Sequence, residues 1–408
     1  MLALVAGDGA APAVGIGRCS IASLVFIGFW RTPYISFPAA GNLSLALLLS
    51  RLHGCRMRIA ELVIENFRNL AMVELRPGPG VNFITGPNAS GKTSLLEAIH
   101  FLARVRSFRT TRPQQLVRHG SDALLVRASL AESQVRLAVR WSANGTQVRI
   151  NGEDVRTLSS LARFLPVQVV NAESQRILLD GPQVRRSFLD WGLFHVEQSY
   201  YDSWRRYDRA LRQRNLALRS KDARLSKSWE PELALQAAAL TRYREDFIAL
   251  LKKTAEPLLA DWLPDESIDF EYRRGWPQSK SLEQAYTEGR ERELELGYSL
   301  YGPHRADLLV RASGMEAQHR LSRGQQKLLA IAMLLAAAAV MHEDNPTILL
   351  IDDLPAELDV TRRKHVLDQL QRIDAQVFIT ATDPAALPVA REQARWFHVE
   401  HGRYREVV

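Results

Sequence analysis

The sequence predicts an α/β fold built from two sequence segments, with a mainly helical lobe inserted between them. Three stretches of different pattern predict it. Residues 57–170 are mostly short apolar runs separated by turn residues, residues 171–299 show helical periodicity, and residues 300–408 alternate helix with strand. Together with residues 1–56, which differ from the rest, these stretches divide the chain into four parts.

The bulk composition is ordinary for a globular protein, with a basic surplus. Hydrophobic residues make up 46% and charged residues 24%, the net charge is +8 and the pI is about 9.6. The surplus favours a polyanionic partner such as a nucleic acid. Both cysteines, Cys19 and Cys55, precede Met57, so the body of the protein can form no disulfide framework and no cysteine metal site. This usage suits a reducing cytosol.

Residues 1–56 are rich in Ala, Gly, Leu and Ser and contain no lysine. Their apolar runs, Ile21–Trp30 and Leu43–Leu49, are shorter than the ~20 residues that span a bilayer. A signal peptide is the alternative, but few basic residues precede the first run. We expect a poorly ordered extension, or an over-long start before Met57, and no membrane segment.

Turn and periodicity signals place the elements in order. Arg58–Ile64 has a strand pattern, and Asn144-Gly145 and Asn151-Gly152 predict hairpins because both residue types tolerate positive φ. In the inserted lobe, Glu230–Leu263 is a long amphipathic stretch. The helices and strands expected near the C-terminus are Gln325–Met341, Thr347–Ile351, Thr361–Ile373 and Gln376–Thr380. The apolar run before Asp352 suits a parallel strand buried on both faces.

One loop matches the pattern G-x-x-x-x-G-K-[ST] between a strand and a helix. Its residues are Gly86, Pro87, Asn88, Ala89, Ser90, Gly91, Lys92 and Thr93. The glycines let the backbone wrap phosphate oxygens at a helix N-terminus, Lys92 can reach the β- and γ-phosphates, and Thr93 can offer its hydroxyl to Mg²⁺. The loop therefore predicts a site for ATP and Mg²⁺.

Two acids, Asp352 and Asp353, end the buried strand Thr347–Ile351. The carboxyl ends of parallel strands form the sheet edge where ligands bind. Asp352 is placed to hold Mg²⁺, and Asp353 to orient or deprotonate the attacking water. Taken alone, the pair would be a turn or a helix cap; with the phosphate loop it predicts a catalytic site.

A third motif, Leu321-Ser322-Arg323-Gly324-Gln325-Gln326-Lys327, precedes an apolar helix, and Ser322 is a suitable N-cap. The three motifs together resemble the phosphate loop, signature and acidic strand of ABC-type ATPases. That resemblance implies that Ser322, Gly324 and Gln325 of one subunit close over the ATP of another. It therefore implies two composite sites in an ATP-dependent homodimer.

Smaller features fit the same resemblance. Gln168 lies where these ATPases carry a glutamine that senses Mg²⁺ and water, which would make it catalytic. Glu357-Leu358-Asp359 resembles the loop that contacts the other subunit, although Ala356 stands where a serine is expected. Thr380 and Thr382 follow a strand where transporters present a histidine to the γ-phosphate, so that role is absent or falls to a threonine hydroxyl.

Several segments resemble the RecF family specifically, from Met57 to the C-terminus. They are Glu65-Asn66-Phe67-Arg68-Asn69-Leu70, Gly181-Pro182-Gln183-Val184-Arg185-Arg186-Ser187-Phe188-Leu189-Asp190, Tyr301-Gly302-Pro303-His304-Arg305-Ala306-Asp307 and the Leu-Ser-Arg-Gly-Gln-Gln-Lys signature. The family also resembles SMC and Rad50 heads. The resemblance implies cytoplasmic, ATP-dependent binding of single-stranded and gapped DNA, slow ATP hydrolysis, and action with RecO and RecR in repair, the damage response and replication restart.

Basic clusters are compatible with salt-dependent contacts to DNA phosphates. Arginines at 104, 106, 109, 112 and 118 follow the phosphate-loop helix, and arginines at 205, 206, 209, 212, 214 and 219 lie on the first long helix of the inserted lobe. The alternative for each arginine is a solvated helix face, because aspartates interleave the second cluster.

Other readings remain open at the level of sequence. A transporter's nucleotide-binding subunit would need a membrane partner and normally a switch histidine. An SMC or Rad50-type head would need long heptad coiled coils, which are absent between the two ATPase segments. A DNA-binding module in which ATP is only a conformational ligand is the third alternative, because Asp353 is one methylene shorter than the usual glutamate.

Overall fold

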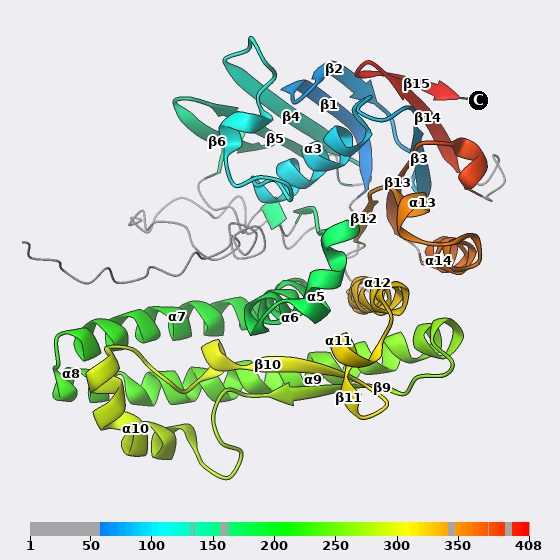
Figure 1. Cartoon of the computed structure of the whole chain (residues 1–408). Coiled ribbons are helices and arrows are strands. Elements are labelled where there is room, and N and C mark those ends of the chain that lie inside the picture. Colours follow the sequence, from blue (N-terminus) through cyan, green and yellow to red (C-terminus); the bar gives the residue numbers. More distant parts are fainter. Residues whose placement is uncertain are drawn as a thin grey trace, which may run out of the picture.

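The computed structural model describes residues 58–131, 133, 135–155, 161–162, 164–341, 347–373, 375–387 and 394–407 (Figure 1). The extension expected over residues 1–56 lies outside these residues. Within them, the α/β fold in two sequence segments with a helical insertion is confirmed.

The centre of the fold is a largely parallel sheet with the strand order β15-β14-β3-β13-β12-β8. Its strands are β3 (Val81–Thr85), β8 (Val167–Val170), β12 (Ile348–Ile351), β13 (Gln376–Ala381), β14 (Arg395–Glu400) and β15 (Arg403–Val407), of which β15 runs antiparallel to β14. All four residues of β12 are buried, as expected for a central parallel strand. The sheet interleaves both segments, because β3 and β8 precede the insertion and the other strands follow it.

An antiparallel sheet with the order β2-β1-β4-β5-β6-β7 lies beside this layer (Figure 1). Its strands are β1 (Ile59–Phe67), β2 (Leu70–Leu75), β4 (Ala123–Leu130), β5 (Arg136–Ser142), β6 (Gly145–Ile150) and β7 (Glu153–Asp154). Both expected hairpins are confirmed: Gly145 and Asn151 have positive φ at the β5–β6 and β6–β7 turns. The buried side chain of Gln376 donates to and accepts from the backbone of Ile59, which joins the two sheets.

Helix α3 (Lys92–Arg104) is buried between the two sheets. Its apolar side chains share one core with β1 and β4 and with Ile348, Leu350 and Phe378 of the parallel sheet. The alternate residues Leu349, Ile351 and Val377 belong to a second core, which includes α12 (Arg323–Val340) and the inserted lobe. The parallel sheet therefore separates two apolar cores, and α12 connects it to the lobe.

The inserted lobe is mainly helical (Figure 1). Its helices are α5 (Arg176–Leu179), α6 (Pro182–Val196), α7 (Gln198–Arg219), α8 (Ala223–Ser228), α9 (Glu230–Trp262) and α10 (Leu282–Leu296). A small sheet of β9 (Ile268–Arg273), β10 (Asp307–Ala312) and β11 (Met315–Glu316), followed by α11 (Ala317–Arg320), packs on these helices. The sequence predicts a boundary between the inserted lobe and the second ATPase segment at residue 300. Strand β9 lies before this boundary and β10 after it, and the two strands pair along their whole length, so the boundary divides one sheet.

In the C-terminal segment, α13 (Leu354–Glu357) and α14 (Val360–Arg372) connect β12 to β13 of the parallel sheet. Across the described ranges, no helix combines the length and the apolar character needed to cross a bilayer.

Gly192 of α6 provides a test of this packing. A Cβ there would lie 2.2 Å from Cζ of Phe247 in α9, so Gly192→Ala forces the two helices apart. Overpacking of this kind costs about 1–3 kcal/mol, against a helix-propensity gain of about 1 kcal/mol. We expect a lower thermal midpoint for Gly192→Ala than for Gly80→Ala, whose Cβ meets nothing within 4 Å. Equal midpoints in differential scanning fluorimetry would contradict this α6–α9 contact.

Candidate functional site

The expected phosphate loop lies between the end of β3 at Thr85 and the start of α3 at Lys92. Gly86 and Gly91 have φ of 152° and 121°, where other residues are strained. A Cβ on Gly86 would also lie 2.1 Å from the carbonyl oxygen of Val399, and one on Gly91 would lie 2.8 Å from Leu70. Glycine is therefore required at both positions by backbone conformation and by space.

Neighbouring segments hold the loop from behind. The backbone N–H of Gly402 donates to the Ser90 carbonyl at 2.9 Å, and the Tyr404 hydroxyl donates to the Gly91 carbonyl at 2.8 Å. Burial raises the pKa of Tyr404 well above its usual range, so this donor keeps its proton. Asn69, from the first RecF-like segment, donates to the Ala89 carbonyl. The loop is thus shaped before any ligand binds.

Lys92 lies over the loop that precedes it. Its ammonium donates to the carbonyl oxygens of Gly86 and Pro87, at 2.8 Å each. Burial lowers the pKa of Lys92, and the negative charges of Asp353 and Asp352 partly oppose that shift. The two acids therefore stabilise the charged lysine at the place where a phosphate would add further negative charge.

Asp352 is held by two threonine hydroxyls from different parts of the chain. The hydroxyl of Thr93 donates to the Asp352 carboxylate at 2.9 and 3.1 Å, and that of Thr380 donates to it at 2.8 Å. The Thr380 hydroxyl also accepts a 2.7 Å hydrogen bond from the backbone N–H of Asp353. The structure thus brings together the predicted metal ligands Thr93 and Asp352, and it joins Thr380 to them through the Asp352 carboxylate.

This donor set fits Mg²⁺ beside a phosphate chain. Within the described residues, no group of three His, Cys, Asp or Glu side chains could hold a metal by itself. Mg²⁺ commonly takes only one or two protein ligands and keeps waters and phosphate oxygens for the rest. A single carboxylate, Asp352, in contact with a single hydroxyl, Thr93, matches that habit.

The signature motif opens α12 as expected. Ser322 caps the helix through a reciprocal pair with Gln325: the Ser322 N–H donates to the Gln325 side chain at 2.9 Å, and the Gln325 N–H donates to the Ser322 hydroxyl at 3.3 Å. A Cβ on Gly324 would lie 2.6 Å from the guanidinium of Arg362 at the start of α14. A helix N-terminus with this cap can bind an anion.

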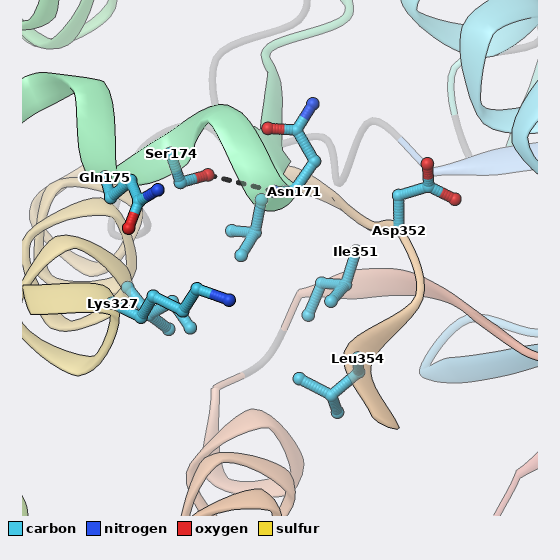
Figure 2. A pocket seen from close by; sticks show the side chains of 9 residues that line it. Asn171, Ser174, Gln175, Lys327, Ile351, Asp352 and Leu354 are labelled. Carbon is cyan, nitrogen blue, oxygen red and sulfur yellow. Dashed lines mark hydrogen bonds between the residues drawn. The ribbon is translucent and has the colours of Figure 1, made fainter. Parts of the chain in front are cut away.

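A small cavity links α12 to the acidic strand end. It is lined by Val170, Asn171, Ser174, Gln175, Lys327, Ile331, Ile351, Asp352 and Leu354. Figure 2 shows Lys327, one turn into α12, reaching toward the strand end that carries Ile351 and Asp352. The sequence pattern assigns Lys327 only to the signature, and no local signal predicts that it lines the same cavity as Asp352.

Gln168 does not join this group. It pairs with Leu349 within the sheet, whereas Asp352 directly follows the last pair, between Ile351 and Val170. Its amide donates to the Val169 carbonyl, and its side chain lines a different cavity. The residue at the strand's carboxyl end is Asn171, which caps the next turn and shares the cavity with Asp352. Asn171 is the first residue after β8, so the end of the strand, and not the presence of a glutamine, is the sequence signal that points to this position.

The loop after the acids is anchored from α14. Buried Arg363 donates to the carbonyl oxygens of Pro355, Leu358 and Ala386, and Asp359 caps α14 through the Arg362 N–H. The side chain of Glu357, expected to meet a second subunit, lies outside the described residues, and so does that of Ala356, which stands where a serine was expected. The loop backbone is thus fixed by Arg363, which the sequence did not single out.

The basic clusters divide into buried and exposed members. Arg214 is fully buried and pairs with Glu230 and Glu293, so its expected place among DNA-facing arginines is wrong. A salt bridge joins Arg109 to buried Glu97. The exposed members are Arg109, Arg112, Arg118, Arg205, Arg206, Arg209, Arg212 and Arg219, of which Arg212 pairs with Asp208. One face of a helix on a protein surface is buried, and residues about seven positions apart lie on the same face. A row of arginines along a helix therefore contains buried members as well as exposed ones.

Comparison with known proteins agrees with this site. The RecF/RecN/SMC N terminal domain family matches residues 58–405. A DNA replication and repair protein RecF of Chromohalobacter salexigens is 41% identical over 357 residues, which cover 85% of this chain and 99% of that protein. The RecF of Shewanella piezotolerans is 39% identical over 355 residues, with the same coverage. The chain belongs to the RecF family.

Solved structures agree with this assignment. The recombination mediator protein RecF-ATP in the RecFOR pathway is similar with a TM-score of 0.75 and 25% identity, covering 86% of this chain and 98% of that one. An Smc head domain from Pyrococcus furiosus, 16% identical with a TM-score of 0.55, shares the fold. A transporter subunit is therefore not the favoured reading.

Two segments that carried the resemblance to the RecF family meet in space. Arg185 forms a two-pronged pair with Asp307, at 2.7 and 3.0 Å, and Arg186 donates to the Ala306 carbonyl. Buried Arg244 of α9 donates to the Pro303 carbonyl and pairs with Asp190. The two segments thus form a joint between α6, α9 and β10, which accounts for their distinct composition without any ligand.

The Thr93 hydroxyl supplies a test of the site. Thr93→Val removes the hydroxyl and nearly preserves the volume, so we expect affinity for ATP in the presence of Mg²⁺ to fall about tenfold or more. Thr93→Ser keeps the hydroxyl and should stay near the wild type. Isothermal titration with Mg²⁺ and with EDTA makes the comparison. If Thr93→Val binds ATP equally well under both conditions, Thr93 does not help to hold Mg²⁺.

Proposed function

We propose that the protein is an ATP-dependent DNA-binding protein of recombinational repair and replication restart. It binds single-stranded and gapped DNA as an ATP-induced homodimer, and it hydrolyses ATP slowly. The observation that carries the proposal is the contact between Thr93 of the phosphate loop and Asp352 of the acidic strand, completed by Thr380. Its place in this family, whose relatives are RecF proteins of replication and repair, supplies the biological context.

Nucleotide binding would begin with Lys92. Its ammonium already bonds two loop carbonyls, and phosphate oxygens offer a stronger, charged acceptor at the same place. Backbone N–H groups at the start of α3 face the same anion. Mg²⁺ held by Thr93 and Asp352 would neutralise charge on the β- and γ-phosphates. The nucleotide would therefore be bound by groups that the fold already orients.

Hydrolysis would use Asp353. Its carboxylate would accept a proton from the attacking water while the bond from the γ-phosphorus to the bridging oxygen of ADP breaks. The backbone of Asp353 is held in the left-handed region, φ 51°, with its N–H bonded to Thr380. A short aspartate on a fixed backbone reaches less far than a glutamate, which is consistent with slow turnover. Slow turnover would let ATP hold the dimer on DNA and let hydrolysis release it.

The capped start of α12 supports a second subunit as the missing half of the site. Ser322, Gly324 and Gln325 present a helix N-terminus that can bind the γ-phosphate of ATP held by the other chain. In such a head-to-tail dimer, the exposed α7 residues Arg205, Arg206, Arg209 and Arg219 would contact DNA phosphates. We place the protein in the cytoplasm with RecO and RecR as its partners, in keeping with a related structure named for the RecFOR pathway.

Asp353→Asn tests the proposal directly. The amide cannot accept the proton, so we expect hydrolysis to fall at least a hundredfold while ATP and gapped DNA still bind. The dimer should then persist on DNA, as read by size-exclusion light scattering with ATP. Asp368→Asn, an exposed acid on α14, is the matched control and should hydrolyse ATP normally.

Two other outcomes have distinct meanings. If the wild type forms no ATP-dependent dimer and ignores gapped DNA, the proposed function is wrong. If the dimer forms on DNA and dissociates at the same rate in the wild type and Asp353→Asn, ATP acts only as a conformational ligand. The first result would contradict ATP-dependent DNA binding itself, whereas the second would contradict only the proposal that hydrolysis releases the dimer from DNA.

A further inference from the structure

Arg362, near the start of α14, lies against the signature motif of the same chain. Its guanidinium nitrogen Nη1 is 2.6 Å from the position that a Cβ on Gly324 would occupy, and α14 lies beside α12 (Figure 1). Gly324 is the second residue of α12, so this arginine covers the first turn of that helix. A glycine at this position therefore leaves room for a cation beside the N-terminus of α12.

Neighbouring contacts fix the backbone of Arg362. The carboxylate of Asp359 caps α14 by accepting a hydrogen bond from the Arg362 N–H at 3.0 Å. The next residue, Arg363, is buried and donates to three backbone carbonyl groups. The start of the helix is thus held in place, and Arg362 can change position mainly by rotating its long side chain.

The guanidinium of Arg362 has donors that no other residue uses. Its Nε pairs with the Asp359 carboxylate at 3.3 Å, and the two side chains are 38% and 55% exposed. An exposed pair of this kind contributes only about 0–1 kcal/mol to stability. In the described part of the chain, no hydrogen bond joins Nη1 or Nη2 to another residue. The fork of donors that binds a phosphate in two places is therefore available.

The signature residues expected to contact ATP are neutral. Ser322, Gly324 and Gln325 carry no charge, and a helix N-terminus contributes a partial charge of about +0.5. During phosphoryl transfer, negative charge spreads over the outer oxygens of the transferred group. A guanidinium beside Gly324 would supply the full positive charge that the end of the helix lacks.

We propose that Arg362 is a further catalytic residue, which acts on the ATP held by the other subunit of the dimer. Its guanidinium binds oxygens of the γ-phosphate that the signature of its own chain contacts. The inference rests on the proposed function, because the composite site exists only in the ATP-bound dimer.

The hydrolysis step defines what Arg362 contributes. The oxygen of the attacking water bonds to the γ-phosphorus while the bond from that phosphorus to the bridging oxygen breaks, and the electrons of the broken bond remain on ADP. The proton of the water passes to Asp353 of the subunit that holds ATP. Arg362 of the other subunit binds the outer oxygens of the phosphoryl group and keeps its own protons. It therefore lowers the barrier by electrostatic attraction alone.

Arg323 is the rival for this role. It is the first residue of α12, and its side chain is exposed. We favour Arg362 because its guanidinium lies against Gly324 and its backbone is fixed by the cap of α14. The experiment includes both arginines.

Single-turnover ATP hydrolysis by the whole chain, with Mg²⁺ and gapped DNA, tests the proposal. We expect Arg362→Gln to lower the rate at least about tenfold, because the transition state loses a charged donor. Its affinity for ATP should stay near that of the wild type, since the phosphate loop of the same chain binds the nucleotide. Arg362→Lys keeps the charge but not the fork of donors, and should show an intermediate rate. Lys364→Gln, an exposed cation on the same helix, is the matched control and should hydrolyse ATP normally.

A mixture of two variants shows whether Arg362 acts across the dimer. Arg362→Gln and Asp353→Asn are mixed in equal amounts without nucleotide, and ATP is then added. In a dimer with one chain of each kind, one ATP site has both Asp353 and the other chain's Arg362 intact. About half of the dimers are of this kind, so about one site in four should hydrolyse ATP. A residue that acts within its own chain, or only supports the fold, gives no recovery.

Recovery of hydrolysis in the mixture is the result that supports the proposal. Thermal unfolding guards against misfolding, and Arg362→Met, which keeps the aliphatic stem, replaces Arg362→Gln if the midpoint of the latter falls. Hydrolysis by Arg362→Gln at the rate of Lys364→Gln would overturn the proposal, and so would a mixture without recovery. Loss of hydrolysis in Arg323→Gln alone would assign the role to Arg323 instead. In each of these cases the wild type still forms its ATP-dependent dimer on DNA, whereas a wild type without that dimer contradicts the proposed function as well.

Discussion

The carboxylate of Asp352 is the point at which the functional centre is joined. It accepts hydrogen bonds from Thr93, at the start of α3, and from Thr380, on β13. Thr93 and Asp352 are 259 positions apart in the sequence, and Asp352 and Thr380 are 28 apart. The first contact therefore joins the ATPase segment before the insertion to the ATPase segment after it. A carboxylate accepts several donors at once, whereas an amide or alcohol at this place could not do so equally well. The phosphate loop, the acidic pair and the end of β13 are thereby fixed in one cluster.

The parallel sheet turns this local cluster into a link between distant parts. One face packs on α3 and the antiparallel sheet, and the other packs on α12 and the inserted lobe. A movement at the strand ends is therefore felt in two close-packed cores, which do not deform continuously. Arg363 fixes the loop between the acids and α14, and Arg362 of the same helix lies on Gly324 of the signature. The residues of the nucleotide site and of the signature are thus connected through α14 within a single chain.

Much of this arrangement could be predicted from the sequence, because its signals are local. The phosphate loop needs glycine at Gly86 and Gly91 for backbone reasons, and the β12 strand shows its burial as an apolar run. What could not be predicted depends on tertiary contact. The burial of Arg214 depends on Glu230 and Glu293, and the pairing of β9 with β10 joins residues on either side of residue 300. Gln168 was placed by residue type, whereas the strand register puts Asn171 at the functional edge.

A crystal structure of the protein with Mg²⁺ and a non-hydrolysable ATP analogue is the direct test of the role given to Asp352. We expect the Lys92 ammonium to leave the Gly86 and Pro87 carbonyls for the phosphate oxygens. We also expect Mg²⁺ to lie between the Thr93 hydroxyl and the Asp352 carboxylate, with Thr380 still bonded to Asp352. A nucleotide bound elsewhere, or a Mg²⁺ ion that contacts neither Thr93 nor Asp352, would contradict it.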